Sequence, residues 1–148
     1  MNAQNAVIIA GPRQDLTNVS AEIDNMMQLM RSDLCIWFDE QFMRVEGALS
    51  AHFQLGGRPP RALVHALQDI YGQAANFGYP VAGRLARSMH RWLDLVGPVR
   101  NAVLAAHLEA MRVILRDDMR GEENKVALAV AEVLEQALEA ATAHNPPA

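Results

Sequence analysis

The sequence is poor in cysteine and in aromatic residues. Cys35 is the only cysteine, so no disulfide can form within the chain. It lies within an apolar pattern of helical spacing, where we expect a plain buried thiol. Aromatic residues make up 5% of the chain and apolar residues as a whole 51%, mostly Ala, Leu, Val and Met. Because strands favour β-branched and aromatic residues, this composition favours helices over a β-sheet.

Two further absences argue against whole classes of function. The chain has no excess of positive charge, with 13 basic against 17 acidic side chains, so nucleic acid is not an expected partner. The short apolar run at residues 7–10 follows no basic segment and is too short for a signal peptide. No segment approaches the ~18 apolar residues that a membrane span requires. These features predict a cytoplasmic protein.

Apolar residues recur at three- and four-residue steps in five segments, which glycines and prolines separate. The expected helices run from the N-cap Ser20 to before Gly56, from Pro59 to Phe77, from Pro80 to before Gly97, from Val99 to about Leu115, and from about Asn124 to Thr142. The first has a candidate break at Ser32-Asp33. Short connections favour antiparallel neighbours, so we predict one all-α, up-down bundle over residues 19–143. Residues 1–18 and 144–148 are expected to be tails, with Val7 to Ile9 lying on the bundle.

The helical spacing also predicts which side chains face inward. On the last helix the expected inward residues are Val126, Val130, Val133, Leu134 and Leu138. On the second helix they are Leu63, Leu67, Ile70, Ala74 and Phe77.

The outward side of the second helix has little side-chain bulk. It consists of His65, Gln68, Gly72 and Asn76, with Ala75 at its edge. A glycine in a helix interior costs about 1 kcal/mol relative to alanine. Either Gly72 leaves a bare surface that a partner can approach closely, or it faces a neighbouring helix or is simply tolerated.

The stretch from Gln68 to Pro80 reads Gln-Asp-Ile-Tyr-Gly-Gln-Ala-Ala-Asn-Phe-Gly-Tyr-Pro. It resembles the central helix of histidine phosphotransfer (HPt) domains. That helix carries a phosphorylated histidine, a lysine three residues later and a glycine four residues later, where a response regulator's receiver domain docks. Gly72 matches the glycine, and the Phe-Gly-Tyr-Pro end is similar to that of one subgroup.

The resemblance continues through the following helices. The segment Arg84 to Asp94 is similar to the next helix of the subgroup, and His107 to Ile114, with Arg120-Gly121, to the one after it. The similarity covers about Ser20 to Ala140. It implies an antiparallel four-helix bundle, here with a long first helix or an additional helix.

Two positions that the chemistry needs are different in this chain. Gln68 stands in place of the phosphorylated histidine, and its amide nitrogen has no free lone pair to attack phosphorus. Tyr71 stands in place of the lysine that neutralises the phosphoryl charge. The resemblance therefore implies a non-catalytic pseudo-HPt protein that binds a receiver domain or a histidine kinase in a bacterial two-component phosphorelay. The expected contact residues are His65, Gln68, Tyr71, Gly72, Ala75, Asn76, Arg84 and Arg87.

Two alternatives stay open. The first is an active phosphorelay protein that uses His65, although Asp69 would then place a carboxylate, not a glycine, against the phosphoryl group. The second is a structural or self-associating bundle. We expect a monomer without a cofactor or metal, because His52, His90, His107 and His144 are scattered and show no metal-ligand spacing. The sequence also contains no phosphate-binding glycine loop and no convincing nucleophile–base pair.

Overall fold

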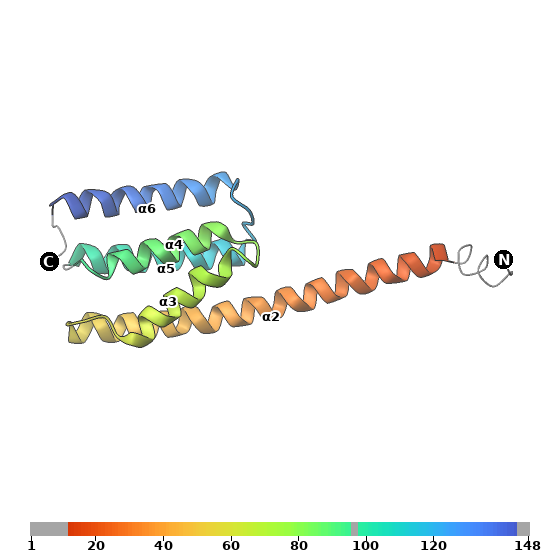
Figure 1. Ribbon diagram of the computed structural model, residues 1–148, viewed down its shortest axis with the longest axis horizontal. Coiled ribbons are helices and arrows are strands. Elements are labelled where there is room, and N and C mark those ends of the chain that lie inside the picture. Colours follow the sequence, from red (N-terminus) through yellow and green to blue (C-terminus); the bar gives the residue numbers. More distant parts are fainter. Residues whose placement is uncertain (1–11, 96–97, 145–148) are drawn as a thin grey trace. The chain divides into compact units, whose positions relative to one another are not determined.

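The computed structural model describes residues 12–95 and 98–144, and these are predominantly helical (Figure 1). Five α-helices follow one another along the chain: α2 (Pro12–Leu55), α3 (Arg61–Ala74), α4 (Pro80–Trp92), α5 (Pro98–Arg116) and α6 (Lys125–His144). No strand occurs within the described ranges, so the all-α prediction is confirmed. None of the described helices is long and apolar enough to cross a membrane. The chain divides into two compact units, Met1–Ile36 and Trp37–Ala148, and each is described by itself.

Helix α2 differs from the expected first helix in two ways. It begins at Pro12, so the stretch from Pro12 to Asn18 is helical and is not the predicted tail. A proline at the first position of a helix has the required φ and lacks only an N–H that would be unpaired there. The helix also continues through Ser32-Asp33 without a break. Cys35 is partly buried. The predicted packing of Val7 to Ile9 concerns residues outside the described part of the chain.

The second half of α2 belongs to the second unit and supplies part of its core. Its buried apolar residues are Phe38, Phe42, Val45 and Leu49. Phe38 packs edge-to-face against Tyr79, with ring centroids 6.2 Å apart. On the surface, Arg112 of α5 donates to the Glu46 carboxylate over 2.6 Å. These contacts join α2 to α5 and to the turn between α3 and α4.

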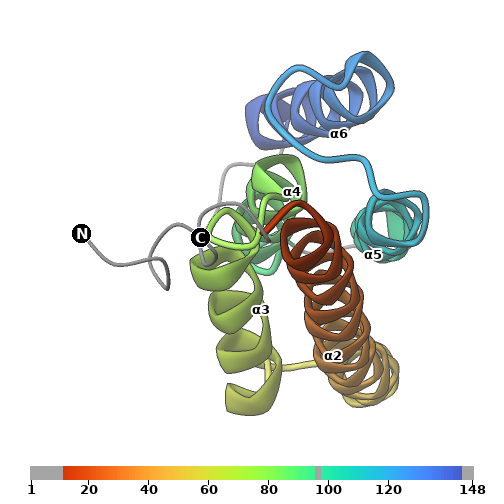
Figure 2. The same ribbon diagram turned by 90° about the vertical axis from the view of Figure 1, so that its right-hand side faces the viewer.

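Helix α4 is the centre of the second unit and contacts α3, α5 and α6 (Figure 2). Val81, Leu85, Met89 and Trp92 are buried, as their spacing predicts. Small residues between them are buried too. A Cβ atom placed on Gly83 would lie 3.4 Å from the carbonyl oxygen of Tyr71. Helices α3 and α4 therefore cross closely, and this contact fixes which side of α3 faces outward.

The predicted register is correct for most of α3 and wrong for part of α6. Leu63, Leu67, Ile70 and Ala74 are buried, whereas Phe77 lies beyond the end of α3 and is 42% exposed. On α6 the valines expected to face inward are exposed instead: Val126 (62%), Val130 (37%) and Val133 (64%). The buried α6 residues are Ala127, Ala131 and Leu138. Ala127 and Ala131 each follow an exposed valine by one residue, so the inward side of this part of α6 is displaced by one residue from the predicted side, whereas Leu138 is buried as predicted.

Both α3 and α5 end in the same way. The Tyr79 N–H donates to the Ala74 carbonyl over 2.8 Å, and the Gly78 N–H donates to Ala75 over 3.1 Å. Gly78 has φ +94°, the left-handed conformation that glycine commonly adopts just after a helix. These are the two hydrogen bonds of a Schellman motif. At the end of α5 the left-handed position is occupied by Asp118, with φ +52°.

Hydrogen bonds join these two helix ends to each other. The Gly121 N–H donates to the Gly78 carbonyl over 3.0 Å. The Tyr79 hydroxyl donates to Asp118 Oδ1 over 2.6 Å, and Arg120 Nε donates to the same oxygen over 2.7 Å. The Arg120 guanidinium also lies 5.0 Å from the centroid of the Tyr79 ring. We call these five residues the turn clasp; it brings together Gly78-Tyr79 and Arg120-Gly121, two of the sequence motifs.

Candidate functional site

The outward side of α3 is an exposed strip of the second unit. It comprises His65, Gln68 and Gly72 on the helix, and Ala75 and Asn76 in the turn that follows. All five residues are exposed, as the helical spacing predicts. We call this set the outer α3 face. The Asn76 side-chain amide donates to the Gly72 carbonyl over 3.4 Å, so it lies along the helix end.

Gly72 has no neighbour that would require a glycine. A Cβ atom built on it would meet no heavy atom of the described residues within 4 Å. It lies within regular α3, so its backbone does not require glycine either. Gly83 on α4 is the opposite case, because the backbone of α3 passes close to it. The interpretation that Gly72 faces a neighbouring helix is therefore wrong.

A positive charge from α4 lies beside the outer α3 face. The Arg87 guanidinium carbon lies 5.6 Å from the centroid of the half-buried Tyr71 ring, within the range of a cation–π contact. His90 packs edge-to-face against the same ring, with centroids 6.5 Å apart. Arg87 itself is exposed. Tyr71 thus holds a guanidinium next to the helix that carries Gln68 and Gly72.

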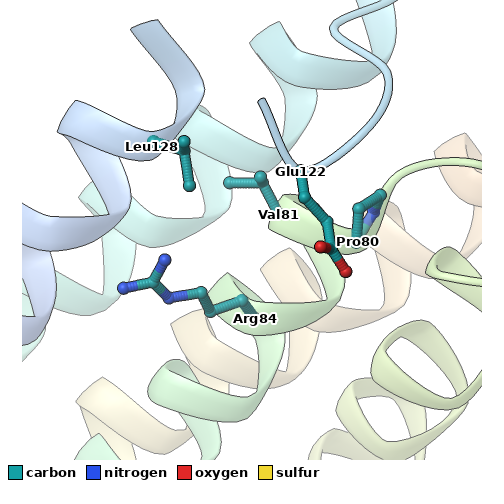
Figure 3. Close-up of a pocket in the computed structure, with 5 residues that line it drawn as sticks. All are labelled: Pro80, Val81, Arg84, Glu122 and Leu128. Carbon is teal, nitrogen blue, oxygen red and sulfur yellow. The ribbon is translucent and has the colours of Figure 1, made fainter. Parts of the chain in front are cut away.

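Arg84 faces a different neighbour. Its guanidinium donates two hydrogen bonds to the Glu135 carboxylate on α6, over 2.5 and 2.7 Å. The hydrogen bond with Glu135 is the main cause that raises the pKa of Arg84, so the guanidinium stays positively charged. Arg84 also lines a pocket of about 360 Å³ together with Pro80, Val81, Glu122 and Leu128 (Figure 3). Of the two predicted arginines, Arg87 contacts Tyr71 of α3, whereas Arg84 pairs with α6.

Ser88 and His107 form a hydrogen-bonded pair of potentially reactive side chains that the sequence did not predict. Ser88 Oγ lies 2.9 Å from His107 Nε2, and His107 Nδ1 lies 2.7 Å from the Val103 carbonyl oxygen. Because that carbonyl can only accept, Nδ1 carries the proton and Ser88 donates to Nε2. Ser88 is 4% exposed and His107 0%, so a substrate cannot reach them. Burial lowers the pKa of His107, and the pair serves to join α4 to α5.

His52 is a second buried histidine. Its Nε2 lies 3.2 Å from a nitrogen of Arg100, which also donates to the Leu95 carbonyl. Burial lowers the pKa of His52, and the charge of Arg100 lowers it further. Within the described ranges, no group of three or more His, Cys, Asp or Glu side chains could hold a metal ion.

The outer α3 face and the adjacent Arg87 are thus the exposed features that the sequence motif and the geometry share. Known proteins offer no guide here. No family model, curated protein or solved structure matches this chain. The HPt resemblance consequently depends on the motifs themselves, chiefly Gly72 to Pro80.

Sequence reasoning placed His65, Gln68, Gly72, Ala75 and Asn76 correctly on one exposed face. It did not anticipate that Tyr71 would contact Arg87 and His90, although the signal exists. Arg87 and His90 are three residues apart and therefore lie on the same side of α4. Only the crossing of α3 over α4 shows that this side meets Tyr71.

Proposed function

We propose that the second unit is an HPt-type four-helix bundle with an additional helix, and that it lacks the phosphoryl-accepting histidine. On this proposal its outer α3 face binds the receiver domain of a response regulator, or a histidine kinase, and so modulates a two-component phosphorelay. The observation that carries the proposal is Gly72, a glycine in a helix interior with open space around its Cβ position. A glycine there costs about 1 kcal/mol relative to alanine, and no contact with another residue that the structure describes compensates for it.

A bare helix surface is useful to a partner that must come close. At Gly72 a partner's backbone can approach to van der Waals distance of the helix, since no side chain stands between them. Gln68 lies one turn earlier on the same side and can both donate and accept hydrogen bonds. It can therefore occupy the place of an unphosphorylated histidine without undergoing its reaction.

Arg87 supplies the positive charge that the family's lysine would otherwise bring. The ring of Tyr71 limits the orientations of the Arg87 side chain, so less conformational entropy is lost when a partner binds. An acidic partner surface, such as the carboxylates around a receiver's phosphorylation site, would be attracted to it. Such a charge at the edge of an interface raises the association rate more than the affinity.

The decisive experiment uses the full chain and the receiver domains of its own organism, each with and without phosphate. Complex formation and phosphate transfer are followed in the same mixtures. We expect binding without transfer. Gly72→Trp should lower the affinity at least about thirtyfold, the loss typical of an interface hot spot.

Gly47→Trp is the matched control, because Gly47 is also a helical, exposed glycine with nothing within 4 Å of its Cβ position. It should leave the affinity unchanged. Gly72→Trp with wild-type affinity and a wild-type melting temperature would overturn the proposal. An acid-labile phosphate that disappears in His65→Ala would instead establish an active relay protein.

The same assay separates the two arginines. Arg87→Gln should slow association and weaken its dependence on salt, whereas Arg84→Gln should leave both as they are, since Arg84 is paired with Glu135. If the association rate falls with Arg84→Gln and not with Arg87→Gln, the contact surface lies on the α6 side of α4 and the assignment to the outer α3 face is wrong.

A further inference from the structure

The described part of the first unit is a helix with many exposed apolar side chains. Eight large apolar residues between Leu16 and Ile36 are 47–68% exposed: Leu16, Val19, Ile23, Met26, Met27, Leu29, Met30 and Ile36. From Leu16 to Trp37 no residue is buried. Helices in proteins owe most of their stability to a packed apolar side rather than to the intrinsic propensity of their residues.

These residues follow a seven-residue pattern. Taking Leu16 as position a, the steps to Val19, Ile23, Met26 and Met30 alternate between three and four residues. This is the spacing of the a and d positions of a coiled coil. Met27 falls at e, and Leu29 and Ile36 fall at g, so all eight exposed apolar side chains occupy the positions that border a partner helix.

The remaining positions of the pattern are polar or small. They hold Thr17, Asn18, Ala21, Asp24, Asn25, Gln28, Arg31, Ser32 and Cys35. Among the a and d positions of the pattern, only Asp33 is charged. It occupies a d position and ends the regular apolar spacing. We call Leu16, Val19, Ile23, Met26 and Met30 the α2 seam.

We propose that the α2 seam is a self-association surface, which a second copy of this chain covers by pairing the two α2 helices. A coiled-coil seam needs a partner helix with the same alternation of steps, so that each side chain enters a hole between four others. A second copy supplies that spacing over the same length. The proposal concerns the first unit and is independent of the function assigned to the outer α3 face.

The area available is close to what a stable pair requires. Burying one such side chain removes on the order of 100 Å² from water, so the eight residues give roughly 800 Å² per copy. A standard protein–protein interface buries about 800 Å² per partner.

The flanking pairs also fit a parallel arrangement, where the g residue of one helix meets the next e residue of the other. Glu22 then meets Met27, and Leu29 meets Leu34, so no like charges face each other.

Sedimentation equilibrium of the full chain from micromolar to millimolar concentration tests the proposal. We expect a reversible dimer whose fraction rises with concentration. The double variant Ile23→Glu/Met26→Glu places charges at one a and one d position and should weaken association at least about a hundredfold. Gln28→Glu is the control, because it adds a negative charge at an f position, on the side of the helix opposite the seam.

Folding of each variant is checked by its thermal transition at a concentration low enough for association to be negligible, where it should not change because no seam residue is buried in the chain itself. A wild-type chain that stays monomeric at millimolar concentration would overturn the proposal. A dimer that persists equally in the Ile23→Glu/Met26→Glu variant would do so too, because another surface would then be responsible.

Discussion

At the scale of single residues, glycine has two opposite roles in this protein. Gly83 lets α3 and α4 cross closely, and Gly78 adopts a left-handed backbone that ends α3. Both are explained by contacts or conformation within the chain. Neither a contact nor a backbone conformation explains Gly72. We therefore expect this glycine to destabilise the fold and to favour partner binding.

Gly72→Ala should therefore stabilise the fold by about 0.5–1 kcal/mol, because alanine is the better helix former and its methyl group meets no atom. Urea unfolding followed by circular dichroism measures the change. Gly47→Ala provides the comparison and should give a similar gain, since its surroundings are equally open. A loss of stability in Gly72→Ala alone would mean that α3 has a neighbour at this position.

At the scale of elements, the contact between α4 and α5 contains a buried histidine. His107 is neutral in the fold, with Nδ1 donating to Val103 and Nε2 accepting from Ser88. Its pKa is lowered by burial, whereas in the unfolded chain it returns to about 6.5. The unfolded chain therefore binds a proton more readily, and acid favours unfolding. His52 has a lowered pKa as well and acts in the same direction.

The free energy of unfolding should be constant above about pH 7 and should fall below about pH 6.5, by at most about 1.4 kcal/mol per pH unit for each histidine. The loss ends where the pH passes the lowered pKa of the folded state. Urea unfolding between about pH 7.5 and about pH 5.5 measures this slope, above the range where most carboxylates titrate. His107→Gln should reduce it. The same slope in His107→Gln as in the wild type would show that other groups cause it.

The sequence predicted most elements of the second unit, and the reasons are local. Proline at the start of α4 and glycine at the end of α3 fix those boundaries whatever lies nearby. The register of α6 was not predictable in this way. Its valines form the more hydrophobic side, yet Ala127 and Ala131 are the buried residues. That choice depends on the distance between helices, which a single sequence does not specify.

The candidate site was predictable to a similar extent. The five residues of the outer α3 face follow from helical spacing alone. The association of Arg87 with Tyr71, and of Arg84 with Glu135, depends on which helices lie on either side of α4. The turn clasp was not predictable either, because Tyr79 and Asp118 are far apart in the sequence and meet only in the folded chain.

At the scale of the whole molecule, the buried core lies in one unit. Every buried side chain in the described ranges falls between Phe38 and Leu138. A chain that begins at Ser32 retains all of them and leaves Asp33 to act as N-cap for the shortened α2. It should unfold at nearly the temperature of the full chain.

Differential scanning calorimetry at low concentration, where association is negligible, measures this comparison. The shortened chain should also remain monomeric at every concentration, since it lacks the α2 seam, and should keep its affinity for the receiver domain. A large fall in the unfolding temperature would mean that residues 12–31 support the core of the second unit.

The outer α3 face shares no residue with the buried core or with the turn clasp. In genetic terms, the positions that fold this bundle and the positions offered for recognition can mutate independently. A glutamine codon becomes a histidine codon by a single base change. Because Gln68 is exposed, that change should leave the stability of the fold unaltered. On the proposed function, a lineage with this scaffold could therefore gain or lose the phosphoryl-accepting histidine in one mutational step, without an intermediate that fails to fold.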